Sequence, residues 1–130
     1  MKKILIAALL ALPALRAGAE VPPELREQLK KEAAQLEVQA AAAPKDAELR
    51  VRLGLTYSRL EQADEAQRAF EAALTLDPKN AGAHFMLGLI FEKKGLRDRA
   101  IAEWKACLEN AADPRMKEKA AKHLKQLSLP

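Results

Sequence analysis

The stretch LGLTYSRLEQADEAQRAFEAALTLDP, residues 53–78, returns in altered form as LGLIFEKKGLRDRAIAEWKACLENAA at residues 87–112. Aligned at this offset of 34 residues, the two copies carry the same residue, or one of similar volume, at each special position. The matched pairs are Leu53 and Leu87, Gly54 and Gly88, Tyr57 and Phe91, Ala66 and Ala100, Phe70 and Trp104, and Ala73 and Cys107. Internal periods of this length indicate supersecondary units stacked on one another.

Each copy has the spacing of two helices. In the first copy, apolar residues recur at helical intervals in two sets: Leu49, Leu53, Tyr57 and Leu60, then Ala66, Phe70, Ala73 and Leu74. Gly54 and Gly88 lack a side chain, so a neighbouring helix can approach closely, and the aromatic residues fill the space beside them. This alternation of small and large volumes predicts two helical hairpins.

The expected helix ends have their own signals. Asp46 and Asn80 stand where the first helix of each copy needs an N-cap, and we expect Asp64 and Asp98 to cap the second helices. Gly95 suits the left-handed residue that stops a helix. Its counterpart in the first copy is Glu61, which predicts that this turn closes differently.

The repeated pattern resembles the tetratricopeptide repeat. In the first copy the resemblance is carried by Leu53, Gly54, Tyr57, Ala66, Phe70, Ala73 and Pro78; in the second by Leu87, Gly88, Phe91, Ala100, Trp104 and Cys107. Arg50 and His84 depart from the tryptophan common in this family. The resemblance implies an all-α fold, a right-handed α–α superhelix, with one repeat over residues 46–80 and another over 81–113. Composition agrees, since good helix formers dominate and no run alternates with the period of a strand.

Helices are also expected on both flanks of the repeats. Residues 20–45 contain a helix over 23–42, interpreted as a degenerate half repeat that packs on the first full one; the alternatives are a mobile arm or a segment folded into the groove. Residues 114–130 place Met116, Ala120, Leu124 and Leu127 on one side of a terminal helix. Such a helix would cap the open end of the array.

Residues 1–19 have the layout of a secretory signal peptide. A basic start, MKK, precedes the apolar run ILIAALLALPAL at 4–15 and an Ala-Gly-Ala site at 17–19. The run is too short to span a bilayer as a helix. We therefore expect export to the periplasm, or secretion, after cleavage near Ala19. Removal of this segment lowers the basic count from 22 to 19 against 18 acids, which gives no argument for nucleic-acid binding.

Candidates for catalysis or metal binding are few. Cys107 occupies a position that needs a small packed residue, so we interpret it as a buried hydrophobe. His84 replaces a packing residue and is expected to be half-buried, and His123 lies on the lysine-rich terminal helix and is expected to be solvated. No spacing matches a zinc site, a phosphate loop or a nucleophile elbow. We expect no catalysis, no cofactor and no metal; an enzyme that uses Cys107 is the third hypothesis.

A binding groove is the leading functional hypothesis. In the family that the sequence resembles, the first helices of successive units line a concave face. Counted from the glycines, four apolar residues would face this groove, Val51, Leu55, Phe85 and Leu89, with a polar rim of Ser58, Arg59, Glu92 and Lys93. The implied partner is an apolar helix or extended segment of another protein. The alternatives are that these side chains are core, or that residues 23–42 fill the groove.

The basic terminal helix supports a second hypothesis. Five basic residues gather on it: Arg115, Lys117, Lys119, Lys122 and Lys125. They suit an anionic membrane surface or an acidic partner, or they simply solvate a capping helix. The sequence thus favours an adaptor or assembly factor of the bacterial cell envelope, with electrostatic docking through this helix as the alternative. Two repeats are fewer than the usual three, which leaves room for a homo-oligomer.

Overall fold

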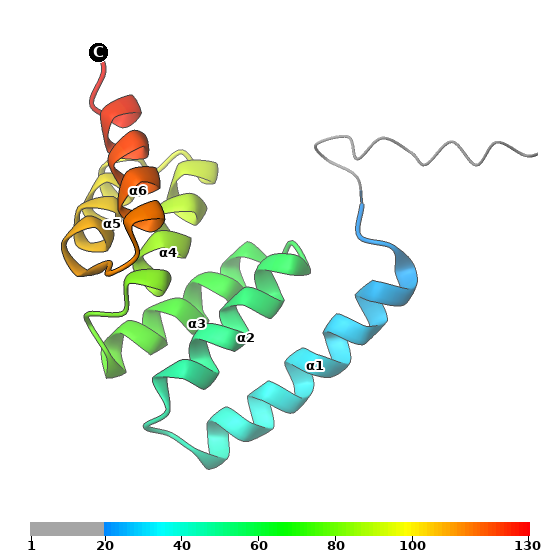
Figure 1. Ribbon diagram of the computed structural model, residues 1–130. Helices are drawn as coiled ribbons and strands as arrows, with labels where there is room; N and C mark the ends of the chain where they lie inside the picture. The colour runs from blue at the N-terminus through cyan, green and yellow to red at the C-terminus, as the bar shows by residue number, and fades with distance from the viewer. Residues whose placement is uncertain (1–19) are drawn as a thin grey trace, which may run out of the picture.

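Six α-helices and no strands make up the regular structure of residues 20–130, the part of the chain that this computed structural model describes (Figure 1). The predicted signal peptide lies outside the described residues. The helices are α1 (Pro23–Ala42), α2 (Ala47–Arg59), α3 (Ala63–Leu76), α4 (Ala81–Lys93), α5 (Arg97–Asn110) and α6 (Pro114–Leu127). The predicted all-α fold class is confirmed.

The helices stack in sequence order. α2 packs on α3 and α4 packs on α5, and these two hairpins join where α3 meets α4. α1 lies beside α2 at one end, and α6 lies against α5 at the other (Figure 1). This is the predicted superhelix of helix pairs, with one extra helix at each end. Within residues 20–130, no helix is both long and apolar enough to cross a bilayer.

The first helices are capped as predicted. Asp46 Oδ1 accepts a hydrogen bond from the Leu49 N–H at 3.1 Å, and Asn80 Oδ1 accepts one from the Ala83 N–H at 2.9 Å. Such caps satisfy N–H groups that have no partner in the helix itself.

The predicted caps of the second helices are wrong. α3 and α5 begin one residue before Asp64 and Asp98, after Gln62 and Leu96, neither of which makes a side-chain cap bond. The two acids lie instead in the first turn, where the positive end of the helix dipole favours a negative charge. Asp64 is also bound by Lys94 Nζ at 2.6 Å, and this contact holds the pKa of its carboxyl below the usual value.

The turns inside the two hairpins close in the same way, which corrects the expectation for Glu61. Gly95 has φ +73° and Glu61 has φ 60°, so both adopt the left-handed conformation. Their backbone hydrogen bonds match as well: Gln62 N–H donates to Tyr57 O at 2.9 Å, and Leu96 N–H donates to Phe91 O at 2.8 Å. Tertiary packing therefore imposes on a glutamate the geometry that favours glycine.

Each hairpin is closed by an aromatic ring seated against a glycine. A Cβ built on Gly54 would lie 2.7 Å from the ring of Phe70, and one on Gly88 would lie 2.6 Å from the indole of Trp104. Both rings are fully buried. The close approach that the sequence predicted is thus present in both units, and it leaves no room for even one methyl group without a shift of the ring.

The flanking helices complete the core. α1 buries Leu29, Ala33 and Leu36 in a cluster with residues of the first hairpin, and Ala40 of α1 is buried as well. Tyr57 O–H donates to Glu37 Oε1 at 2.7 Å, and burial together with this bond raises the pKa of Tyr57 to about 12. α6 buries Ala120 and packs Met116, Leu124 and Leu127 on the second hairpin. The interpretation of α1 as a degenerate half repeat stays a prediction.

Candidate functional site

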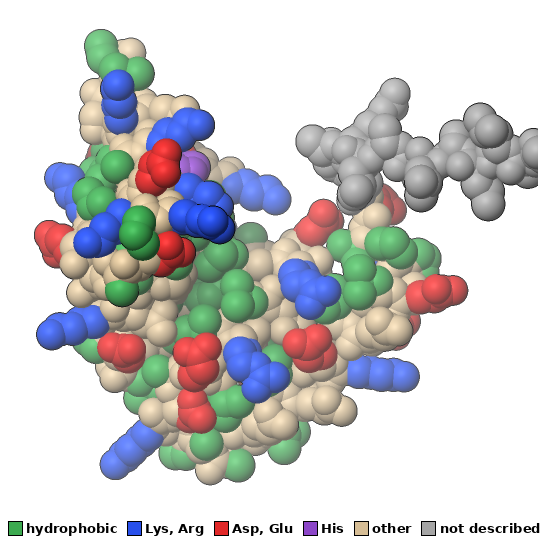
Figure 2. Space-filling view, viewed as in Figure 1, with side chains coloured by type: hydrophobic (Ala, Val, Ile, Leu, Met, Phe, Trp, Pro, Cys, Tyr) green, Lys and Arg blue, Asp and Glu red, His purple; other side chains and the backbone are tan. Residues whose placement is uncertain are grey.

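Two adjoining cavities lie on the surface formed by the first helices. The larger, about 510 Å³, is lined by Glu32, Arg52, Leu55, Thr56, Ser58, Arg59 and Met86. The smaller, about 150 Å³, is lined by Ser58, Glu61, Ala63, Met86, Leu89, Ile90 and Lys93. Because they share Ser58 and Met86, we treat them as one groove of α2 and α4, the α2–α4 groove. Figure 2 shows the molecule hollowed between α1 and α6, with hydrophobic side chains gathered over α2 and α4.

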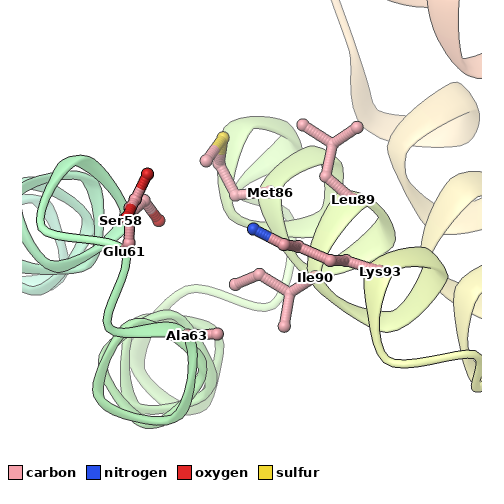
Figure 3. A pocket seen from close by; sticks show the side chains of 7 residues that line it. All are labelled: Ser58, Glu61, Ala63, Met86, Leu89, Ile90 and Lys93. Carbon is pink, nitrogen blue, oxygen red and sulfur yellow. The ribbon is translucent and has the colours of Figure 1, made fainter. Parts of the chain in front are cut away.

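The smaller cavity lies between α4 and the region where α2 ends and α3 begins. Met86, Ile90 and Lys93 project from α4 toward Ser58 of α2 and Glu61 of the following turn (Figure 3). Ala63, at the start of α3, completes the lining. A partner segment in this cavity would therefore meet apolar carbon and an ammonium group on one side and a hydroxyl and a carboxylate on the other.

The polar groups of the groove differ in how they are satisfied. Thr56 is buried, and its hydroxyl lies 3.1 Å from Glu32 Oε1 and 3.0 Å from the Arg52 carbonyl, so it links α1 to α2. The Ser58 hydroxyl is buried with no hydrogen-bond partner among the described residues. A buried hydroxyl without a partner carries a free-energy cost that a bound polar group could remove. Ser58 lines both cavities, and its role in recognition stays a prediction.

Five of the eight residues predicted for the groove line it: Leu55, Ser58, Arg59, Leu89 and Lys93. Leu55 is 40% exposed. Their role in binding stays a prediction, but their geometry suits it.

The other three predicted residues serve the protein's own packing. Val51 is buried in the core, and Phe85 packs edge-on against Trp104 with ring centroids 4.9 Å apart. Glu92 Oε2 accepts the Trp104 Nε1–H at 3.0 Å and lies 2.7 Å from His123 Nδ1. Neither Val51 nor Phe85 lines the two cavities, because Val51 is buried in the core and Phe85 packs on Trp104 of α5 in its own hairpin.

Met86 is the main groove residue that the sequence reasoning missed. It lies three residues before Leu89 and so shares its helix face, a signal that counting from Leu89 rather than from Gly88 would have found. Arg52 has the same relation to Leu55. Thr56, Ile90, Glu32, Glu61 and Ala63 were also missed, and the last three come from elements whose position only the fold defines.

The residues weighed for chemistry have structural surroundings. Cys107 is fully buried, as expected, and burial raises the pKa of its thiol. His84 Nδ1 lies 2.6 Å from Glu103 Oε2 and Nε2 lies 2.7 Å from the Pro78 carbonyl. The bond to Glu103 is the main cause of a raised His84 pKa. Among the described residues, no group of three or more His, Cys, Asp or Glu could hold a metal ion.

His123 is not solvated as predicted. Its imidazole stacks on Trp104, with ring centroids 4.3 Å apart and an interplanar angle of 15°. Stacking on a buried indole explains why this histidine is half-buried although Lys122 and Lys125 beside it are exposed. The five basic residues of α6, Arg115, Lys117, Lys119, Lys122 and Lys125, are all exposed, as a docking helix or a solvated cap would require.

Comparisons with known proteins agree with this architecture. The family model for the tetratricopeptide repeat matches residues 51–114. Among curated proteins, no sequence matches significantly. The structure of the type III secretion translocator chaperone SycD of Yersinia enterocolitica is 16% identical, with a TM-score of 0.68 over 83% of this chain and 86% of that chain.

Two further solved structures have the same fold. SycD of Yersinia enterocolitica in complex with a peptide of the translocator YopD is 18% identical, with a TM-score of 0.66 over 84% of this chain and 96% of that chain. The Sgt2 TPR domain of Aspergillus fumigatus is 20% identical, with a TM-score of 0.55 over 82% and 83% of the two chains. The residues that match the tetratricopeptide-repeat model, 51–114, include most of the two helix hairpins, α2–α3 and α4–α5.

Proposed function

We propose that this protein is a non-catalytic binding module, an adaptor or assembly factor of the bacterial cell envelope. Its α2–α4 groove would hold an apolar helix or an extended segment of a partner protein. The observation that carries this proposal is a continuous apolar lining, Leu55, Met86 and Leu89, left open between tightly packed hairpins. Clustered exposed apolar side chains in a concavity are typical of partner sites.

The similar fold of SycD supports the proposal, because that chaperone has been solved with a peptide of a translocator protein. In this chain the floor of the groove belongs to helices that are fixed by the seated rings of Phe70 and Trp104. A preformed groove loses little conformational entropy when a partner binds.

The experiment compares two charge substitutions in capture from an envelope extract. The variant Leu55→Glu/Met86→Glu places carboxylates in the groove and should lose the partner. Val38→Glu is the matched control, because Val38 is 71% exposed on α1 and lines neither cavity of the groove. A partner retained by the wild type and by Val38→Glu but lost by the double variant supports the groove. Equal retention by all three proteins contradicts it, provided that circular dichroism shows them folded.

The envelope location is part of the same proposal and depends on residues 1–19. If the segment is a signal peptide, the protein isolated from the envelope fraction begins at Glu20. N-terminal sequencing of that protein tests this directly. An intact Met1 in the isolated protein argues against cleavage.

A second candidate function is electrostatic docking through α6, because its five basic residues are all exposed. In that case, neutralising the α6 lysines should abolish capture while Leu55→Glu/Met86→Glu leaves it unchanged. Binding of this kind should also weaken as salt is raised, since exposed charges are screened.

A further inference from the structure

α6 occupies the place of a first helix in an incomplete third unit. Asp113 is its N-cap residue, as Asn80 is that of α4, although Asp113 Oδ1 accepts from the Arg115 N–H, two residues on, at 3.0 Å and Asn80 Oδ1 from the Ala83 N–H, three residues on, at 2.9 Å. With these two caps aligned, Ala120 takes the position of Leu87, and both are buried. α6 therefore continues the row of helices, α2 then α4, that forms the groove.

The same alignment predicts which side of α6 borders the groove. Lys119, Lys122 and His123 take the positions of Met86, Leu89 and Ile90, and these three residues of α4 line the smaller cavity. The contacts of His123 agree, because it reaches both Trp104 and Glu92 of the second hairpin. Figure 2 shows Lys and Arg side chains gathered over α6 beside the hollow. The apolar floor thus continues into a basic wall.

Basic residues also border the groove on the other helices. Arg52 and Arg59 line its larger cavity and Lys93 its smaller one. Within residues 20–130, none of these three, nor Lys119 or Lys122, has a carboxylate oxygen within 4.0 Å. Two basic residues outside the groove lining are, by contrast, neutralised by ion pairs: Lys94 with Asp64, and Arg99 with Glu71.

The acids of the groove do not balance these charges. Glu32 and Glu61 are its only carboxylates in the described residues that line the cavities, and Glu32 is already engaged by the Thr56 hydroxyl. The cavities themselves are lined by three basic residues and two acids, and Lys119 and Lys122 of α6 add two more basic side chains on the side that the alignment assigns to the groove. Charges of one sign in a concave site raise the local concentration of oppositely charged ligands and select among them.

We infer that the groove takes an acidic amphipathic segment of a partner protein. Its apolar side chains would lie on Leu55, Met86 and Leu89, and its Asp or Glu residues would face Lys119 and Lys122 of α6. This inference rests on the proposed function and unites the groove and the basic helix in one surface. Only the side of α6 that bears Lys119 and Lys122 takes part.

The test uses a displayed library of short random peptides, selected on the full chain. Selected peptides are then measured on three variants: Leu55→Glu/Met86→Glu, Lys119→Glu/Lys122→Glu and Lys105→Glu/Lys117→Glu. The last is the control, because it makes the same change in net charge at exposed residues of α5 and α6. Lys117 takes the position of His84, which faces Glu103 rather than the groove.

We expect the selected peptides to combine apolar residues with Asp or Glu, and to bind Lys119→Glu/Lys122→Glu about tenfold more weakly. The control variant should bind them as the wild type does. The inference is overturned if the selected peptides are not enriched in Asp or Glu, or if both lysine double variants weaken their binding equally. If those peptides still lose affinity for Leu55→Glu/Met86→Glu, the proposed groove is supported even though the inference fails. If no selected peptide depends on Leu55 or Met86, the proposed function fails and the inference fails with it.

Discussion

The two repeats share one backbone plan but differ in how far their aromatic rings reach. Phe70 packs against Gly54 and has no polar atom in its ring, whereas Trp104 packs against Gly88 and also donates its Nε1–H to Glu92. The indole further contacts Phe85 and His123. The second repeat thus joins its own hairpin to α6 through one side chain. At equivalent positions of the two repeats, one aromatic residue therefore stabilises its own hairpin and the other also holds the terminal helix.

The first repeat makes its outward connection with other residues. Thr56 and Tyr57 of α2 reach Glu32 and Glu37 of α1 through their hydroxyls. The ring of Phe70 takes no part in these bonds. Removal of the Phe70 ring should therefore only leave a cavity, whereas removal of the Trp104 ring should also weaken the packing of α6 on the second hairpin.

The largest expected effect comes from removing each ring. Trp104→Ala and Phe70→Ala should each lower the free energy of unfolding by about 3–5 kcal/mol, because both side chains are fully buried. We expect the greater loss at Trp104, because its removal takes away the indole N–H that Glu92 accepts and the ring on which His123 stacks. Urea unfolding followed by circular dichroism measures both losses. Equal losses, or a greater loss at Phe70, would contradict the proposed link to α6.

A smaller effect is expected where each glycine meets its ring. Gly88→Ala and Gly54→Ala should destabilise by about 1–3 kcal/mol, because the new methyl carbon would lie 2.6 Å or 2.7 Å from a buried ring. Gly82→Ala is the matched control, since its nearest contact is Asn80 Oδ1 at 3.4 Å. Helix propensity alone favours alanine at all three positions. Urea midpoints that rise in all three variants would show that the rings move aside without cost.

Much of this fold could be predicted because its signals are local. Residue type and spacing alone indicate the repeat period, the caps Asp46 and Asn80, and the pairing of small residues with aromatic ones. The left-handed Glu61 could not be predicted, because propensity argues against it and only the matching hairpin imposes it. Similarly, Asp64 is one residue away from the cap position that its side chain suggests.

The groove residues proposed from the sequence differ in where the structure puts them. Leu55 and Leu89 line the two cavities, whereas Val51 is buried in the core and Phe85 packs against it. The difference depends on the angle at which hairpins stack, which periodicity along one helix does not define. His123 shows the same limit, since its stacking on Trp104 requires α6 to lie in one orientation. A site formed between several helices can be predicted only when the relative positions of those helices are known.

A third contrast lies in the turns that close the two hairpins. Gly95→Glu copies the first repeat into the second and should cost about 1–2 kcal/mol, while Glu61→Gly should gain about 1 kcal/mol. A left-handed backbone crowds a Cβ but not a glycine. Thermal unfolding of the two variants measures both changes. A stabilised Gly95→Glu would contradict the shared geometry of the turns.

The smallest predicted effect concerns the residue that approaches the proline carbonyl before each repeat. In the first repeat, Arg50 Nη2 donates to Pro44 O at 3.5 Å; in the second, His84 Nε2 lies 2.7 Å from Pro78 O. His84 Nδ1 also faces Glu103, so both ring nitrogens meet acceptors and the charged imidazolium satisfies both. The Glu103 bond is the main cause of the raised His84 pKa, and Asp77 adds to it.

A folded pKa raised above the unfolded value makes protonation stabilising. The contribution of His84 should be complete below about pH 6.5, the unfolded pKa, and should be lost as pH rises through the higher folded pKa. His84→Arg copies the first repeat with a permanent charge and should remove this dependence. Unfolding in urea across this pH range, with wild type and variant compared, isolates His84 because His123 is present in both. If the variant keeps the full slope of the wild type, His84 is not the source of the pH dependence.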